Sequence, residues 1–453
     1  MRGMSGAAFG RRPAQRACPA VAQARALSKP ERQCGADRAA DRAGRGPHGP
    51  ADQGAGLERA RCDRLPAQGA RDRARAALQH QGRVTVQPIS NLYVHIPFCK
   101  HKCGYCDFNA YAGMDRLMPD YVSALESELA AARERQEFAP LQTVYLGGGT
   151  PSLLPANLMR RLLSFIRDTF DVAPNAEVTL EANPASTDES RLSAWLESGV
   201  NRLSLGVQGF EPRALAVLER KTDAAQATRA FNLARSMGVA NISIDLIYAV
   251  PHQSLESWVD TLRRGLALGP DHVSTYCLTF EEGTLLWRRR AEGKLPELAP
   301  DLQWDQLDAA CAELESAGFR RYEVSNWARP GFESRHNLAY WRCRPVYGAG
   351  AGAHSYATDG SRAWRSWNVA RPREYIAACP AATADGEELD PRKARAESLM
   401  LGLRTAEGMT PPAGFDAELD SLTSAGLVSA IDGRVVPTRR GMDLHNQIAL
   451  AVL

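Results

Sequence analysis

Short apolar runs rich in β-branched residues alternate with amphipathic segments from residue 92 onward. The runs lie at 92–96, 143–146, 177–181, 202–207, 242–247 and 272–278 and predict six strands. Two helix faces repeat at a four-residue step: Tyr121, Leu125 and Leu129, then Leu158, Leu162, Ile166 and Phe170. Segments 223–237 and 255–268 are also predicted to be helical. Six βα units in series indicate an α/β fold with a parallel sheet curved into a partial (β/α)6 barrel.

The alternation stops after about residue 280. Residues 285–375 are rich in Trp, Arg and Gly, and residues 390–453 hold short helical segments and a hairpin-like Asp432-Gly-Arg-Val-Val-Pro. We therefore expect a barrel core over 84–285, an α+β extension over 286–389 and a small winged-helix-like domain over 390–453.

Residues 1–83 differ in composition from the rest of the chain. They carry a net charge of +10, one aromatic residue, Phe9, and no Ile, so they cannot bury enough apolar surface to fold. We expect this segment to be disordered. An organelle transit peptide is disfavoured by the scattered Asp and the scarcity of Ser. A gene start assigned too early, with the native chain beginning near Val84, is a third interpretation.

The net charge and the distribution of Cys residues limit which classes of protein this chain can belong to. Residues 84–453 carry a net charge of −7, which gives no support for nucleic-acid binding, so packing or a lid role is expected of the winged-helix-like domain. No apolar stretch reaches the ~18 residues of a membrane span, and no signal-peptide core is present. Outside residues 1–83 and one cluster, the Cys residues are isolated at Cys277, Cys311, Cys343 and Cys379. This usage is typical of a reducing compartment, and we expect a cytoplasmic protein.

The cluster is Cys99, Cys103 and Cys106, a C-x3-C-x2-C run on a loop directly after the first strand. Three thiolates this close can hold three irons of a [4Fe–4S] cluster and leave the fourth iron without a protein ligand. A zinc site is the alternative, with His95 or His101 as a fourth ligand, but this spacing is not that of a zinc ribbon.

A glycine run, Gly147-Gly148-Gly149-Thr150-Pro151, follows the second strand and leaves bare backbone for close approach by a ligand. Together with Asn91–Cys106, this run resembles the radical S-adenosylmethionine (radical SAM) superfamily. The resemblance implies that SAM chelates the open iron and that an electron from the cluster splits it into methionine and a 5′-deoxyadenosyl radical. It also implies contacts from Gly148, Gly149 and Thr150 to SAM.

Further polar residues stand at or near the ends of the predicted strands. Each by itself is as consistent with a capped turn or a solvated charge. Together they resemble the set with which this superfamily grips SAM: Arg220 for the carboxylate, Glu181 and Gln208 for the methionyl and ribose groups, Asp245 for the ribose side, and Tyr93 as a further contact.

Within the superfamily, the segment from Asn91 to the C-terminus resembles the group that holds the oxygen-independent coproporphyrinogen III dehydrogenase, HemN, and the heme chaperone, HemW. The dehydrogenase has a further Cys where this chain has Phe108. The chaperone carries His-Asn-x-x-Tyr-Trp, which is intact here as His336-Asn337-Leu-Ala-Tyr340-Trp341. The segments 323–327 and 347–354 also resemble the chaperone branch.

The resemblance implies a protein that binds heme, a [4Fe–4S] cluster and SAM, and that delivers heme to acceptor proteins, with membrane-associated respiratory enzymes among the candidates. No catalytic residue is assigned. His336 offers an imidazole for heme iron, while Tyr340 and Trp341 offer flat apolar surface. Alternatively, His336 and Asn337 satisfy a loop while Trp341 fills a core. A radical SAM decarboxylase of coproporphyrinogen III and an enzyme that modifies heme are the other function hypotheses. Monomer and homodimer both stay open.

Overall fold

The computed structural model describes residues 86–453. The expectation of disorder over residues 1–83 lies outside these residues. Most strands belong to one nine-stranded sheet of order β11-β1-β4-β5-β6-β7-β8-β10-β9. Its strands are β1 (Ile89–Ile96), β4 (Phe138–Gly148), β5 (Val172–Ala182), β6 (Arg202–Gln208), β7 (Asn241–Tyr248), β8 (His272–Cys277), β9 (Arg320–Arg321), β10 (Asn326–Ala328) and β11 (Tyr347–Ala349).

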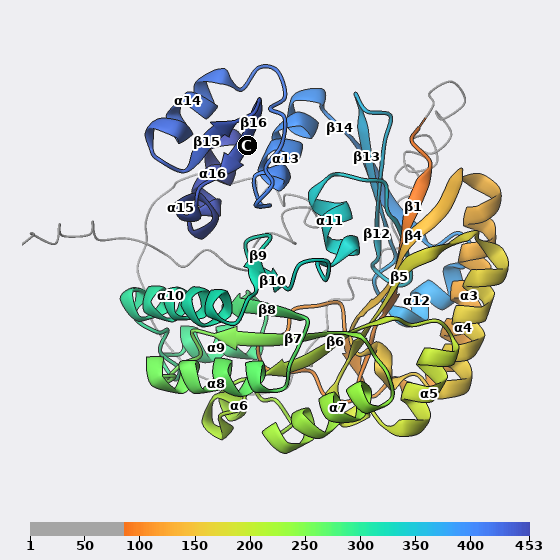
Figure 1. The fold of residues 1–453 in the computed structure, drawn as a ribbon. Coiled ribbons are helices and arrows are strands. Elements are labelled where there is room, and N and C mark those ends of the chain that lie inside the picture. The colour runs from red at the N-terminus through yellow and green to blue at the C-terminus, as the bar shows by residue number, and fades with distance from the viewer. Residues whose placement is uncertain (1–85) are drawn as a thin grey trace, which may run out of the picture.

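The six predicted strands are confirmed as β1 and β4 to β8, and each pairs in parallel with the next. β11 adds a parallel strand beside β1, whereas β10 and β9 close the other edge in antiparallel pairing. The sheet is therefore the curved partial barrel that the pattern predicts (Figure 1). Because β9, β10 and β11 come from beyond residue 285, the sheet runs across the predicted boundary there, and the domain limits stay a prediction.

Helices cover the outer face of this sheet (Figure 1). They are α3 (Met118–Arg135), α4 (Ala156–Thr169), α5 (Glu189–Glu197), α6 (Pro212–Val217), α7 (Ala224–Ser236), α8 (Leu255–Ala267) and α10 (Pro300–Ser316), with short 3-10 turns η2 (Asp115–Leu117), η3 (Pro151–Leu153) and η4 (Pro184–Ser186). α9 (Leu285–Ala291) instead packs on the loop after β1, where Leu286 N donates to Gly104 O over 2.9 Å. Both predicted helix faces are buried, on α3 and α4, and Phe170 caps α4 rather than extending it. Among the described residues, none of the helices has the length and apolar character needed to cross a bilayer.

The strands alternate between an apolar outer face and a polar inner face. Leu92, Val94 and Leu146 are buried in the apolar core, whereas the rings of Tyr93 and Tyr145 stack with centroids 6.1 Å apart on the other face. Successive side chains on a strand point to opposite sides, so this alternation gives each core strand polar groups inside the barrel.

The chain after the barrel forms two further units. β12 (His354–Thr358), β13 (Ala363–Asn368) and β14 (Thr383–Leu389) make an antiparallel sheet, flanked by α11 (Arg335–Trp341) and α12 (Pro372–Ala378). The last unit holds α13 (Pro391–Gly402), α14 (Asp416–Ser424), α15 (Arg439–Asp443), α16 (His445–Val452) and the hairpin β15 (Val428–Ile431) to β16 (Arg434–Pro437). Asp432 and Gly433 take the positive φ of a tight hairpin turn, as the sequence predicts.

A buried carboxylate fixes the β11 edge to the outer helices. Glu128 of α3 is 3 % exposed and accepts hydrogen bonds from Tyr347 Oη (3.1 Å), Gly350 N (2.9 Å), Asn368 Nδ2 (2.7 Å) and Tyr375 Oη. Burial raises the pKa of this carboxyl above its usual range, although the four hydrogen bonds act against that shift. One side chain thus joins α3, β11, β13 and α12.

Glu128→Ala should destabilise the fold by about 3 kcal/mol, because four buried donors lose a shared acceptor. Urea unfolding followed by circular dichroism measures the change. Glu134→Ala, at an exposed position of the same helix, is the matched control and should stay within about 0.5 kcal/mol of wild type. Equal stabilities for both variants would show that the network contributes nothing.

Candidate functional site

The three-cysteine loop closes on itself directly after β1. β2 (Phe98–Cys99) pairs in parallel with β3 (Tyr111–Ala112), and Tyr111 N donates to Pro97 O over 2.7 Å. Asn109, within the loop, ties it to the segment after β11 and to residue 370, since its Nδ2 donates to Ala351 O and Ala370 O, both over 2.9 Å. The loop is therefore a fixed structure at the carboxyl end of the first strand.

Each cysteine has a distinct environment. Cys99 is buried with its Sγ 3.4 Å from Thr150 Oγ1, and Cys103 Sγ lies 3.8 Å from an Arg220 guanidinium nitrogen. Burial raises the pKa of the Cys106 thiol to about 11. In the described part, no three His, Cys, Asp or Glu side chains surround one ion position. In an iron–sulfur cluster each thiolate binds its own iron, so three thiols that do not converge on one ion position fit that group.

The glycine run is packed against this loop. Gly148 has φ +116, and a Cβ there would lie 2.5 Å from the His95 ring; a Cβ on Gly149 would lie 2.8 Å from Phe98 O. The N–H groups of both glycines are engaged within the protein, Gly148 with Glu181 Oε2 (3.0 Å) and Gly149 with Ile96 O (2.9 Å). The close packing of the glycine run on the cysteine loop therefore requires glycine at both positions. The two N–H groups bind acceptors within the protein rather than a ligand.

Gln208 and Arg220 share the space that Gly206 leaves open. A Cβ on Gly206 would lie 3.1 Å from a side-chain nitrogen of each. A bulge in β6 precedes Gln208, which takes the strained φ of +70. Arg220 donates to Gly206 O, and its Nε is buried without a partner among the described residues. Backbone strain and a buried guanidinium nitrogen without a partner are typical of a ligand site, here beside the cysteine loop.

Two carboxylates stand further along the carboxyl-end edge of the sheet, which we call the rim. Glu181 Oε1 accepts a hydrogen bond from Tyr145 Oη over 2.8 Å, and Ser204 Oγ lies 3.3 Å from both Asp245 oxygens. The pKa of Glu181 is raised to about 7, first by burial and then by the nearby Asp245, while the Tyr145 hydrogen bond opposes the shift. Burial also raises the pKa of Asp245. Together they form an acidic wall suited to a cationic ligand.

Tyr93 points inward on β1, and its hydroxyl lies 2.9 Å from His95 Nδ1. The residues predicted to bind SAM thus come from the carboxyl-end halves of neighbouring parallel strands and the loops that follow them. Sequence reasoning missed Tyr145 and Ser204, which support this set, and considered His95 only as a zinc ligand. The alternation of side chains along a strand could have identified them, because each lies on a predicted strand at a position that faces the barrel interior.

The segment 336–341 lies elsewhere, at the opposite end of the barrel. It forms α11, whose first N–H groups, of Arg335 and His336, donate to the Glu177 carboxylate over 3.0 and 3.1 Å. His336 is 1 % exposed, and its Nδ1 lies 2.7 Å from Thr143 Oγ1. Its ring stacks on Tyr145 at 4.9 Å, and its Nε2 is buried without a partner in the described part of the chain. Burial lowers the pKa of His336 to about 3. The ring therefore fills this end of the barrel, which we call the barrel floor, as a neutral imidazole.

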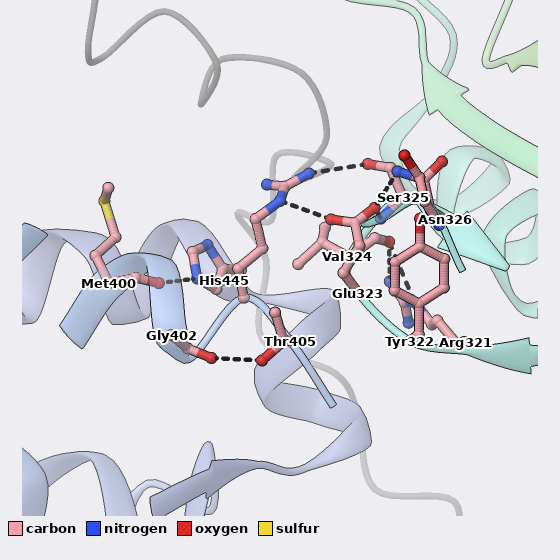
Figure 2. Close-up of polar contacts among 12 residues, drawn as sticks. Arg321, Tyr322, Glu323, Val324, Ser325, Asn326, Met400, Gly402, Thr405 and His445 are labelled. Atoms are coloured by element: carbon pink, nitrogen blue, oxygen red, sulfur yellow. Dashed lines mark hydrogen bonds and ion pairs between the residues drawn. The ribbon is translucent and has the colours of Figure 1, made fainter. Parts of the chain in front are cut away.

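The remaining motif residues pack nearby. Tyr340 meets His336 edge-on at 5.1 Å, and Asn337 N donates to Ser334 Oγ over 3.3 Å. The Arg404 guanidinium lies 4.4 Å from the Trp341 ring centre and forms a 2.6 Å ion pair with Glu323. Figure 2 shows Glu323 also reaching Ser325 and Asn326. The segments 323–327 and 336–341 therefore meet at one arginine of the C-terminal unit.

Residues 93–265 match the family model described as the radical SAM superfamily. Over 377 residues the chain is 38% identical to the heme chaperone HemW of Mycobacterium tuberculosis (strain CDC 1551 / Oshkosh), covering 81% of this chain and 95% of that protein. The chain belongs to the HemW family of radical SAM proteins. The HemW of Bacillus subtilis (strain 168) is 31% identical, covering 81% of this chain and 99% of its own length.

The fold is shared with a solved relative. The structure of coproporphyrinogen III oxidase (HemN) from Escherichia coli superposes with a TM-score of 0.71 at 24% identity, covering 83% of this chain and 93% of that one. This likeness establishes a HemN-type radical SAM fold with its C-terminal extension. Membership of the radical SAM superfamily implies a [4Fe–4S] cluster and SAM as cofactors.

Replacing any one of Cys99, Cys103 and Cys106 with Ser should remove most of the iron from anaerobically reconstituted protein, which should otherwise hold about four irons per chain. Iron and sulfide analysis with absorption spectra measures this. Cys311→Ser, at an isolated buried cysteine, is the control and should keep its iron. One equivalent of tightly bound zinc in place of iron would rule out the cluster.

Proposed function

We propose that this protein is a heme chaperone that carries a SAM-liganded [4Fe–4S] cluster and passes heme to acceptor proteins. The observation that carries this proposal is the similarity to HemW proteins over nearly their whole length. The intact cysteine loop and the polar rim beside it support the same conclusion, because they provide the ligands that a cluster and SAM require.

Cys99, Cys103 and Cys106 would hold the cluster. Arg220, with its buried Nε, would pair with the SAM carboxylate, and Gln208 would reach the methionyl group. Glu181 and Asp245 would face the cationic and ribose portions, with Tyr93, Gly148, Gly149 and Thr150 at the wall between strands and cysteine loop. When bound, the cluster can supply one electron to SAM. The residues of the chain bind and orient the two cofactors and exclude water.

The heme contact predicted for His336, Asn337, Tyr340 and Trp341 stays a prediction. His336 is 1 % exposed and stacks on Tyr145, so heme would have to displace groups packed around this imidazole to reach it. In the arrangement described here, the segment joins the barrel to the C-terminal unit.

A radical SAM decarboxylase of coproporphyrinogen III is the second candidate, and the HemN-type fold is the observation that favours it. Phe108 counts against it. The resemblance to the dehydrogenase implies a further Cys at this position, and Phe108 is 61% exposed. An exposed phenyl ring cannot bind iron.

Reconstituted, reduced protein incubated with SAM and coproporphyrinogen III should leave the tetrapyrrole intact, and the same protein incubated with heme should return bound but unmodified heme. Mass spectrometry of the extracted tetrapyrroles distinguishes the outcomes. Loss of carboxyl groups from coproporphyrinogen would establish the decarboxylase, and a methylated or opened heme would establish a heme-modifying enzyme.

The affinity for SAM should rise with pH through about 7. Below that pH Glu181 is protonated, so cationic SAM must displace a proton to gain the ionised carboxylate, and affinity falls by up to about tenfold per pH unit. Equilibrium dialysis of SAM between pH 6 and 8 measures the slope. Glu181→Gln should flatten it, while Glu189→Gln, an exposed control, should keep it. A slope unchanged in Glu181→Gln would exclude Glu181 as its source.

A further inference from the structure

His354 begins β12 at the edge where the chain folds back over β11. Gly348 of β11 has no room for a Cβ because the backbone of His354 lies against it, and Ser355 Oγ accepts from Gly348 N over 3.0 Å. Since Gly348 pairs with Tyr93 in the sheet register, this crossing lies beside the first strand of the barrel.

The ring of His354 is partly exposed and has no protein partner for either nitrogen among residues 86–453. Nδ1 is enclosed, so Nε2 is the nitrogen that can reach a ligand. On the paired position of β13, the Trp367 ring lies 5.8 Å from His354 at an angle of 33°. An imidazole with a free nitrogen beside a flat indole is a combination suited to a planar ligand that contains a metal ion.

The other described histidines lack this combination. Both ring nitrogens of His95 and His272 are hydrogen-bonded, and His336 and His445 are buried. His101 and His252 are exposed, without a ring contact among the described residues. Burial and the nearby Arg365 lower the pKa of His354, so its imidazole is neutral at pH 7, the form that binds metal ions.

The position of His354 also relates it to the cysteine loop. The turn that leads into His354 is held by Asn109 of that loop through Ala351 O, and a Cβ on Gly352 would lie 2.6 Å from Asn109 Nδ2. Asn109 O in turn contacts His95 Nε2 over 2.9 Å. A ligand on His354 would therefore be held by a segment in direct contact with the loop of Cys99, Cys103 and Cys106.

We propose that His354 Nε2 is an axial ligand of the heme iron and that Trp367 flanks the porphyrin, at the cysteine-loop end of the barrel rather than at its floor. This inference rests on the proposed function, heme binding, and names the residues that carry it.

The test titrates anaerobically reconstituted full-length protein with ferric heme b and follows the Soret band. His354→Ala should weaken heme binding at least about tenfold. Removing a residue that only hydrogen-bonds to a metal ligand already costs about tenfold or more, and a direct ligand should cost no less. Added imidazole should restore the band in this variant. His354→Met should keep heme with a shifted spectrum, because Met is also an axial ligand of heme iron.

Trp364→Ala is the matched control, because Trp364 lies on the same strand as Trp367 but on its opposite face. It should bind heme as wild type does, whereas Trp367→Ala should weaken binding. An iron–sulfur absorbance equal to wild type in each variant shows that the fold is intact. If His354→Ala fails this control, His354→Gln is used in its place.

The outcomes separate the two levels of the proposal. If wild type binds heme while His354→Ala and His354→Met leave affinity and spectrum unchanged, the inference is wrong and the chaperone function stands. If His336→Ala alone lost heme binding, the axial ligand would be His336 at the barrel floor and not His354. If wild type binds no heme, the proposed function itself fails.

Discussion

Parallel pairing of β1 with β4 and of each following core strand with the next is the constraint on which the rest of this structure depends. It brings the carboxyl ends of six strands to one edge, so the cysteine loop, the glycine run, Glu181, Gln208 and Asp245 meet although more than a hundred residues separate the first from the last. The same pairing turns alternate side chains inward. Polar groups such as Tyr145 and Ser204 thereby stand below the rim and hold its carboxylates.

The rim combines groups that are costly to bury without a ligand. The Arg220 Nε has no partner among the described residues, Gln208 has a strained backbone, and the pKa values of Glu181 and Asp245 are both raised. A zwitterionic, cationic ligand would relieve several of these costs at once, since its carboxylate can pair with the arginine and its positive charges with the acids.

The barrel floor and the C-terminal unit are joined by interactions of another kind. Glu177 caps α11, His336 fills the floor, and Arg404 connects Glu323 to Trp341. Removing one partner of a buried ion pair such as Glu323–Arg404 costs about 3–5 kcal/mol, because the other charge is left buried without a partner. The heme site inferred for His354 lies away from this joint, where β12 folds back over β11.

The sequence by itself determined the six core strands, the helices α3 and α4 and the cysteine loop, because hydrophobic periodicity and loop chemistry are local properties of a chain. The candidate SAM residues came from the resemblance to the radical SAM superfamily and stay a prediction. It could not determine the place of His336, whose motif reads equally as a ligand segment and as a buried joint. Only the tertiary structure decided that this ring lies under Tyr145 while His354 keeps a free nitrogen beside Trp367. The reason is that burial and hydrogen-bond satisfaction depend on partners such as Thr143 and Glu177, which lie more than 150 residues away in the chain.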